Sequence, residues 1–196
     1  MAMRLATLLA ACAIALAACA PKPEPFHATD LTGTPLGGPL ALADHTGMPR
    51  TLADFKGKVV ILFFGYTQCP DVCPTNMSAM ARVMELLGPE AAAKVQVLFV
   101  TVDPERDTAE LLAQYVPSFN PSFLGLVGTP AQIEAIAKEF RIFFKKQPGA
   151  TPTTYTVDHS AGSYVYDPKG TLRLYLKHGD APEKIAADVR RLLAGE

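Results

Sequence analysis

The stretch VVILFFGYTQCPDVCP, residues 59–74, decides the fold. Its first six residues are β-branched, leucine or phenylalanine without polar alternation, which is typical of a strand buried on both faces. Farther along the chain, apolar residues recur every three or four positions, as on the inner face of an amphipathic helix: Met77, Met80, Ala81, Met84 and Leu87. We therefore expect a strand, a short loop and then a helix over residues 74–87, ended by Gly88 and Pro89.

A second uninterrupted apolar run, residues 95–102, follows this helix. Strand, helix and strand form a βαβ unit, whose strands are parallel and whose crossover is right-handed. Further patterns predict a hairpin over 40–52, a helix from Asp107 or Thr108 to 115, a short strand or extended segment over 123–127, a helix from Thr129, a hairpin of 163–166 and 172–176, and a helix over 182–193. The predicted fold class is α/β: a single domain with a mixed central sheet, helices on both faces, an N-terminal hairpin and a late β-hairpin.

The composition supports one folded domain and limits its partners. The chain has 196 residues, of which 49% are hydrophobic and 19% charged, enough for one core of ordinary size. It carries 18 Lys and Arg against 19 Asp and Glu, so no net charge draws it to nucleic acid or to an anionic membrane surface. We expect no nucleic acid partner.

The N-terminal residues have the pattern of an export signal. Residues 5–18 form an uncharged apolar run, shorter than the roughly 20 residues of a spanning helix. The run ends in LAAC, residues 16–19, which resembles a bacterial lipobox, in which the cysteine (here Cys19) is acylated after cleavage. The alternatives are a plain secretory signal and an uncleaved anchor. We predict a lipoprotein signal peptide (1–18), a Pro-rich tether (19–35) and a folded domain (36–196) outside the cytoplasm.

The folded part has two cysteines, Cys69 and Cys73, between the predicted strand and helix. A disulfide between residues four apart closes a very small loop and adds little stability. The carboxyl end of a strand is a common place for active sites, and the amino end of a helix favours thiolates. Asp71 acts in the opposite direction unless a bound cation is present. On these residues alone, a metal site, a regulatory disulfide and a peroxide-reactive thiol all stay open.

Three segments, in this order, resemble the Sco/SenC family. They are FGYTQCPDVCP (64–74), VDPERDT (102–108) and YTVDHS (155–160), and the likeness extends over residues 36–194. Ala109 departs from the family pattern, in which a proline is common at this position. The resemblance implies a thioredoxin-like fold and a copper chaperone that helps to assemble the dinuclear copper centre of cytochrome c oxidase.

The resemblance further implies that Cys69, Cys73 and His159 bind one copper ion, as Cu(I), Cu(II) or both. Two thiolates and an imidazole suit a thiophilic metal, and three protein ligands leave a position open for transfer, although zinc accepts the same donors. Tyr66 and Asp103 are candidates for the lining of the site. Asp158 is either a neighbour of a ligand or a turn residue. We expect that His27, His45 and His178 are not ligands. The methionines of the predicted helix are expected to belong to the core.

We therefore predict a membrane-tethered metallochaperone of the bacterial cell envelope, anchored through lipid on Cys19 with its domain on the periplasmic side. Its expected partners are the copper-receiving subunit of cytochrome c oxidase and another periplasmic copper chaperone. The alternative is a thiol-disulfide oxidoreductase, which uses a redox disulfide of Cys69 and Cys73 to keep oxidase-subunit cysteines reduced. The CxxxC spacing, where thioredoxins have CxxC, counts against general oxidoreductase activity. A peroxiredoxin fits less well, because no motif places an arginine to polarise a peroxide.

Overall fold

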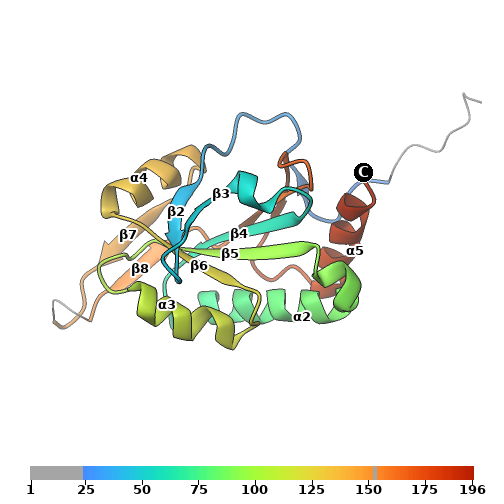
Figure 1. The fold of residues 1–196 in the computed structure, drawn as a ribbon. Helices are drawn as coiled ribbons and strands as arrows, with labels where there is room; N and C mark the ends of the chain where they lie inside the picture. The colour runs from blue at the N-terminus through green and yellow to red at the C-terminus, as the bar shows by residue number, and fades with distance from the viewer. Residues whose placement is uncertain (1–23, 152–153) are drawn as a thin grey trace, which may run out of the picture.

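The computed structural model describes residues 24–151 and 154–196 (Figure 1). A large sheet has eight strands in the order β1-β10-β9-β4-β5-β6-β2-β3, and β7 and β8 form a separate pair. The strands are β1 (Thr29–Asp30), β2 (Ala41–Asp44), β3 (Pro49–Thr51), β4 (Val59–Gly65), β5 (Val95–Thr101), β6 (Leu124–Val127), β7 (Phe144–Gln147), β8 (Thr156–His159), β9 (Ser163–Tyr166) and β10 (Leu172–Leu176). The α-helices are α2 (Val72–Ala92), α3 (Ala109–Tyr115), α4 (Pro130–Glu139) and α5 (Pro182–Leu193), and the short 3-10 helices are η1 (Leu52–Phe55) and η2 (Val116–Ser118). The predicted signal peptide and Cys19 lie outside the described residues.

The two apolar runs that were predicted as buried strands form the centre of the large sheet. β4 and β5 pair in parallel over their whole length, from Val59 opposite Val95 to Gly65 opposite Thr101. Every residue of both strands is buried. β6 adds to β5 in parallel and β9 adds to β4 antiparallel, so the sheet is mixed, as expected.

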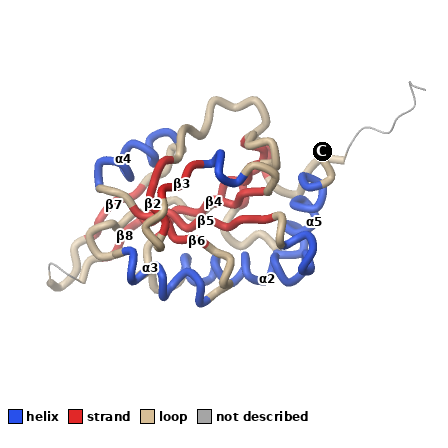
Figure 2. The backbone as a smooth tube through the Cα atoms, viewed as in Figure 1, coloured by secondary structure: helices blue, strands red, loops and turns tan. Residues whose placement is uncertain are grey.

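Helices cover both faces of this sheet, as Figures 1 and 2 show. Successive strand residues point to opposite faces, so Phe63 and Phe64 mark the two layers. The Phe63 ring lies 5.9 Å from that of Phe99, on the face covered by α2, α3 and α5. The Phe64 ring lies 5.4 Å from that of Phe140, which directly follows α4 on the other face.

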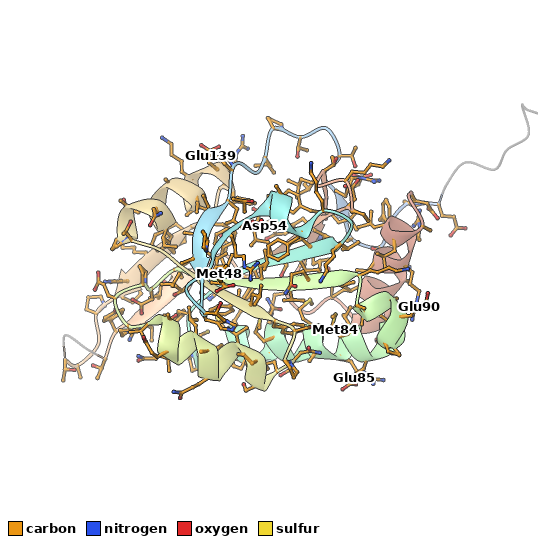
Figure 3. All side chains as sticks on the ribbon, in the orientation of Figure 1. Met48, Asp54, Met84, Glu85, Glu90 and Glu139 are labelled. Carbon is orange, nitrogen blue, oxygen red and sulfur yellow. The ribbon has the colours of Figure 1, made fainter. Side chains whose placement is uncertain are left out.

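Helix α2 buries its predicted apolar face. Met77, Met80 and Met84 are all buried, and in Figure 3 Met84 lies on the sheet side of α2 while Glu85 lies on the outer side. The regular helix breaks at Gly88, where the sequence predicts that it ends. Gly88 takes a φ of 77°, which glycine adopts without strain, and the chain resumes a short helical segment behind it up to Ala92.

The fold begins before residue 36, the start expected from the sequence. Strand β1 pairs with the edge strand β10, Thr29 opposite Tyr175. Just before β1, the backbone amides of His27 and Ala28 donate to the buried carboxylate of Asp188, at 3.1 and 2.8 Å. Residues 27–30 of the expected tether therefore lie against the domain. None of the helices in the described ranges combines the length and the hydrophobicity that crossing a membrane requires.

The pair β7–β8 was not predicted. Its register places Phe144 opposite His159 and Gln147 opposite Thr156. Neither strand has an apolar run, and Val157 is the one fully buried residue of the two. A polar, partly exposed hairpin of this kind gives no periodic signal, so no element was predicted around His159, which is the last residue of β8.

Candidate metal centre

The structure brings the three predicted ligands together. Cys69 lies in the loop after β4, Cys73 in the first turn of α2, and His159 at the end of β8. One ligand atom from each can be chosen so that all three lie within 4.8 Å of one another, and the Sγ of Cys73 is 3.3 Å from the Nε2 of His159. Within residues 24–151 and 154–196, this is the one cluster of at least three histidine, cysteine or acidic side chains that could hold a metal ion.

The loop between β4 and α2 places both sulfurs through backbone hydrogen bonds. The amide of Cys69 donates to the carbonyl of Tyr66, at 3.3 Å, which turns the loop back on itself. The amide of Cys73 donates to the Sγ of Cys69, at 3.4 Å. This amide is one of those at a helix start that have no partner within the helix, so the sulfur of Cys69 supplies its acceptor.

The end of β4 needs a glycine to leave room for Cys73. A Cβ atom built on Gly65 would lie 2.8 Å from the Sγ of Cys73 and 2.8 Å from the Phe63 ring. It would also lie 2.9 Å from the ring of Phe99. Because a larger residue would collide with three buried side chains, Gly65 fixes how closely the Cys73 sulfur approaches the sheet.

The histidine presents its Nε2 toward the sulfurs. The Nδ1 of His159 lies 2.9 Å from the carbonyl oxygen of Ser160. A carbonyl only accepts, so Nδ1 carries the hydrogen and Nε2 keeps a free lone pair for a metal. The rings of Phe63 and Tyr66 pack edge-on against the imidazole, at centroid distances of 6.0 and 5.8 Å. Tyr66 therefore lines the site, as the sequence suggested.

Burial changes the acidity of two of the ligands. Burial raises the pKa of the Cys73 thiol far above its ordinary value, and the nearby charges of Cys69 and Asp107 act in the same direction. Burial also lowers the pKa of His159, against the effect of backbone hydrogen bonds with Ser160 and Phe64. The helix terminus was expected to favour thiolates at both cysteines, and at Cys73 desolvation outweighs it. A bound cation supplies the missing positive charge and reverses this balance.

The remaining candidates from the sequence have other partners. Asp103 accepts hydrogen bonds from Tyr155 and Arg106, at 2.7 and 2.5 Å. Asp158 accepts from the side chain of Gln147, at 2.5 Å, on the exposed side of the hairpin. The other histidines lie outside the cluster: the Nδ1 of His45 accepts from the amide of Gly125, the Nδ1 of His178 contacts the side-chain oxygen of Asn76, and His27 contacts Asp188 through its backbone.

Two buried polar residues support the site and were not identified from the sequence. Asp107 accepts from the amide and the hydroxyl of Thr67, at 3.0 and 2.6 Å, and from the hydroxyl of Thr101, at 2.6 Å, which holds the start of the cysteine loop against β5. Asn76 of α2 donates to the carbonyl of Ala161, at 2.8 Å, just beyond His159. Asp107 lies in the motif VDPERDT and could have been found there. Asn76 gave no signal, since it lies in the interior of a predicted helix.

Known proteins share both this sequence and this fold. The SCO1/SenC family model matches residues 28–194. The mitochondrial SCO2 homolog of Bos taurus is 40% identical over 158 residues, which cover 80% of this chain and 59% of that protein. This chain thus spans about three fifths of the length of the curated relatives it matches.

Two solved structures extend the comparison to three dimensions. The copper-bound ScoI of Bradyrhizobium japonicum is 40% identical with a TM-score of 0.74, covering 80% of this chain and 99% of that one. The apo Sco1 of Thermus thermophilus is 42% identical with a TM-score of 0.76, covering 86% and 98%. The predicted thioredoxin-like fold class is confirmed by these likenesses. With most of its length matched in sequence and in fold, the chain belongs to the SCO1/SenC family.

Proposed function

We propose that this protein is a membrane-tethered copper metallochaperone, which carries one copper ion on Cys69, Cys73 and His159 to the dinuclear copper centre of cytochrome c oxidase. The observation that carries the proposal is the convergence of two thiols and one imidazole within 4.8 Å, on three separate elements. The copper-bound relative from Bradyrhizobium japonicum supports copper as the cargo.

The donor set fits copper in both oxidation states. Two thiolates satisfy the soft Cu(I) ion, whereas Cu(II) prefers nitrogen or oxygen donors beside sulfur, which His159 supplies. Three protein ligands leave room for a group from the receiving protein. Zinc accepts the same three donors, so the titration described below includes it as a competitor.

The two cysteines differ in accessibility, which suggests an order for copper transfer. Cys73 is fully buried under Gly65, whereas Cys69 is partly exposed in the loop. A partner's thiolate therefore reaches the copper ion most easily from the side of Cys69, and Cys73 remains attached to the ion longest. Loading requires Cys73 to lose its proton, so the raised pKa of this thiol makes copper binding dependent on pH.

The proposed location is the bacterial cell envelope, with the domain held on the periplasmic side by lipid on Cys19. The copper-receiving subunit of cytochrome c oxidase is the proposed partner. A second periplasmic copper chaperone is proposed as the source of the ion. Fractionation of cells that express Cys19→Ala tests the anchor, because a variant that is processed and stays as firmly bound to membranes as the wild type excludes lipid on this residue.

A second candidate function is reduction of the cysteines of an oxidase subunit. The observation that favours it is the closeness of the two free thiols, one of which is partly exposed. In such a step the Cys69 thiolate attacks the target disulfide, and Cys73 then displaces the target by forming the Cys69–Cys73 disulfide. The target receives two electrons and two protons.

Anaerobic titration of the reduced full-length protein with Cu(I) and Cu(II), followed by absorption spectroscopy, tests the main proposal. We expect one ion per chain, thiolate-to-Cu(II) charge-transfer bands, and loss of both in Cys69→Ala and Cys73→Ala. His45→Ala serves as the control, since His45 contacts Gly125 and none of the proposed ligands. Binding that survives both cysteine substitutions, or that zinc abolishes at equal concentration, would overturn the proposal. Stoichiometric reduction of a disulfide-containing target without copper binding would favour the second candidate.

A further inference from the structure

The histidine ligand lies on an arm that is separate from the main sheet. Strands β7 and β8 pair only with each other, and Figure 1 shows them at one end of the molecule. After His159 the chain returns to the main body of the domain, where the side chain of Asn76 donates a hydrogen bond to the carbonyl of Ala161. Before His159, the arm contacts the body through the buried Val157, whose amide donates to the hydroxyl of Tyr66, and through Tyr155, the residue before β8. The position of His159 therefore depends in part on how Tyr155 is held.

Tyr155 is held by two charged residues of the turn after β5. Its hydroxyl donates to the Oδ1 of Asp103, at 2.7 Å, and its carbonyl accepts from the Nη1 of Arg106, at 2.8 Å. The guanidinium carbon of Arg106 lies 3.5 Å from the centre of the Tyr155 ring, a close cation–π contact. Asp103 is fully buried and its carboxylate is paired with the Nε of Arg106, at 2.5 Å. We name these three residues the clasp.

The clasp also contacts the cysteine loop. The same Nη1 of Arg106 donates to the side-chain oxygen of Gln68, at 3.1 Å, next to Cys69 in the sequence. The guanidinium lies 5.7 Å from the ring of Tyr66, and the hydroxyl of Tyr66 accepts from the amide of Val157 in β8, at 3.2 Å. One guanidinium thus contacts the segment that carries Cys69 and the segment that leads to His159.

The ring of Tyr155 also contacts a weaker pair, Lys146 with Glu105. The Nζ of Lys146 lies 4.8 Å from the ring centre and 2.5 Å from the carboxylate of Glu105. Both of these side chains are largely exposed, and exposed ion pairs contribute little to stability. The side chains of Asp103 and Arg106 are 0% and 12% exposed, so their contacts with Tyr155 are the ones that fix the arm.

We propose that the clasp of Asp103, Arg106 and Tyr155 positions His159 against Cys69 and Cys73, and so determines how well the site holds Cu(II) relative to Cu(I). This inference rests on the proposed function. The three residues are positioning residues, because they touch the segments that carry the ligands and not the ligand atoms. Cu(I) can be held by the two thiolates alone, so loosening the arm weakens Cu(II) binding more than Cu(I) binding.

Graded substitutions separate the contacts of the clasp. Tyr155→Phe removes the hydrogen bond to Asp103 and keeps the ring over Arg106, whereas Tyr155→Leu removes both. Arg106→Lys keeps the charge and loses the planar group that contacts Gln68 and Tyr155 together. Two controls match these changes: Tyr166→Phe removes a hydroxyl that has no hydrogen-bond partner among the described residues, and Arg173→Lys alters an arginine that is paired with Asp167 and lies near Phe26.

Each variant is compared with the wild type by two measurements. Amide hydrogen exchange of the reduced, metal-free protein reports on the arm, at Val157 and at Ser160, whose amide donates to Phe143. Anaerobic titrations with Cu(I) and with Cu(II) report on the site, together with the Cu(II) charge-transfer spectrum. We expect Tyr155→Leu and Arg106→Lys to speed exchange at these two amides about tenfold and to weaken Cu(II) binding about 10- to 100-fold, with altered bands. Cu(I) binding should change by less than about threefold, since both thiolates remain.

Tyr155→Phe should give intermediate values, and the two control variants should match the wild type. Unchanged exchange in Tyr155→Leu and Arg106→Lys would overturn the inference, as would equal weakening of both ions. The melting temperature of the metal-free protein separates local loosening from unfolding, because a general loss of structure speeds exchange in β4 and β5 as well. If the wild type binds no copper, the proposed function fails, and the exchange measurement still decides whether the clasp holds the arm.

Discussion

A methyl group at Gly65 tests how tightly the end of β4 holds Cys73. In Gly65→Ala the new Cβ would lie 2.8 Å from both the Cys73 sulfur and a Phe63 ring carbon, and 2.9 Å from a Phe99 ring carbon. Carbon atoms in good contact are about 3.5–4.0 Å apart, so these neighbours must move by roughly 1 Å. All three are at most 1% exposed and cannot swing into solvent.

Overpacking of this kind costs about 1–3 kcal/mol of folding free energy. For a domain of this size, the loss corresponds to a fall in melting temperature of about 2–12 °C. The site should suffer as well, because the sulfur of Cys73 is displaced from its position 3.3 Å from the Nε2 of His159. We expect Cu(I) and Cu(II) affinities to fall by about tenfold or more, since Cys73 serves both ions.

Urea unfolding of the reduced, metal-free protein measures the stability, and anaerobic copper titration measures the site. Gly125→Ala is the matched control. Gly125 lies in β6, away from the three ligands, and its new Cβ would lie 3.0 Å from Leu112 and 3.1 Å from Val116. We expect this control to lose stability and keep wild-type copper affinity. Wild-type stability and affinity in Gly65→Ala would refute the reasoning, and so would an equal loss of affinity in the two variants.

Four further outcomes are expected. In His159→Ala, Cu(II) binding is lost or greatly weakened while Cu(I) stays bound through Cys69 and Cys73, and parallel titrations that show equal weakening would contradict this. Protein shown by mass spectrometry to be fully disulfide-bonded should carry no copper, because oxidation removes two of three ligands. Folding raises the pKa of Cys73 above its ordinary value of 9.0, so above about pH 9 the thiol loses its proton in the unfolded chain first. The stability of the metal-free protein, measured by urea unfolding, should therefore fall as the pH rises above about 9, and it should fall less in Cys73→Ser. Asp188→Ala should destabilise the domain by about 1–3 kcal/mol in the same assay, because two backbone amides before β1 lose their acceptor.

The sequence by itself determined the parts of the fold that depend on local pattern. The uninterrupted apolar runs of β4 and β5 are buried over their whole length, and the spacing of the methionines gave the inner face of α2. A strand buried on both faces has no polar positions, and a helix packed on one side has an apolar residue every third or fourth place. Each pattern is complete within a single element, so it can be read without the rest of the chain.

Only the tertiary structure decided how the site is assembled. Cys73 and His159 are 86 residues apart, and the arm that brings them together has no periodic pattern. The roles of Arg106 and Gly65 were equally hidden, because each depends on contacts with elements distant in sequence: Tyr155 for the arginine, and Cys73 with Phe99 for the glycine. The raised pKa of Cys73 was hidden for the same reason. The helix terminus that favours a thiolate is visible in the sequence, whereas the burial that opposes it arises only when the sheet, the loop and the arm pack around the sulfur.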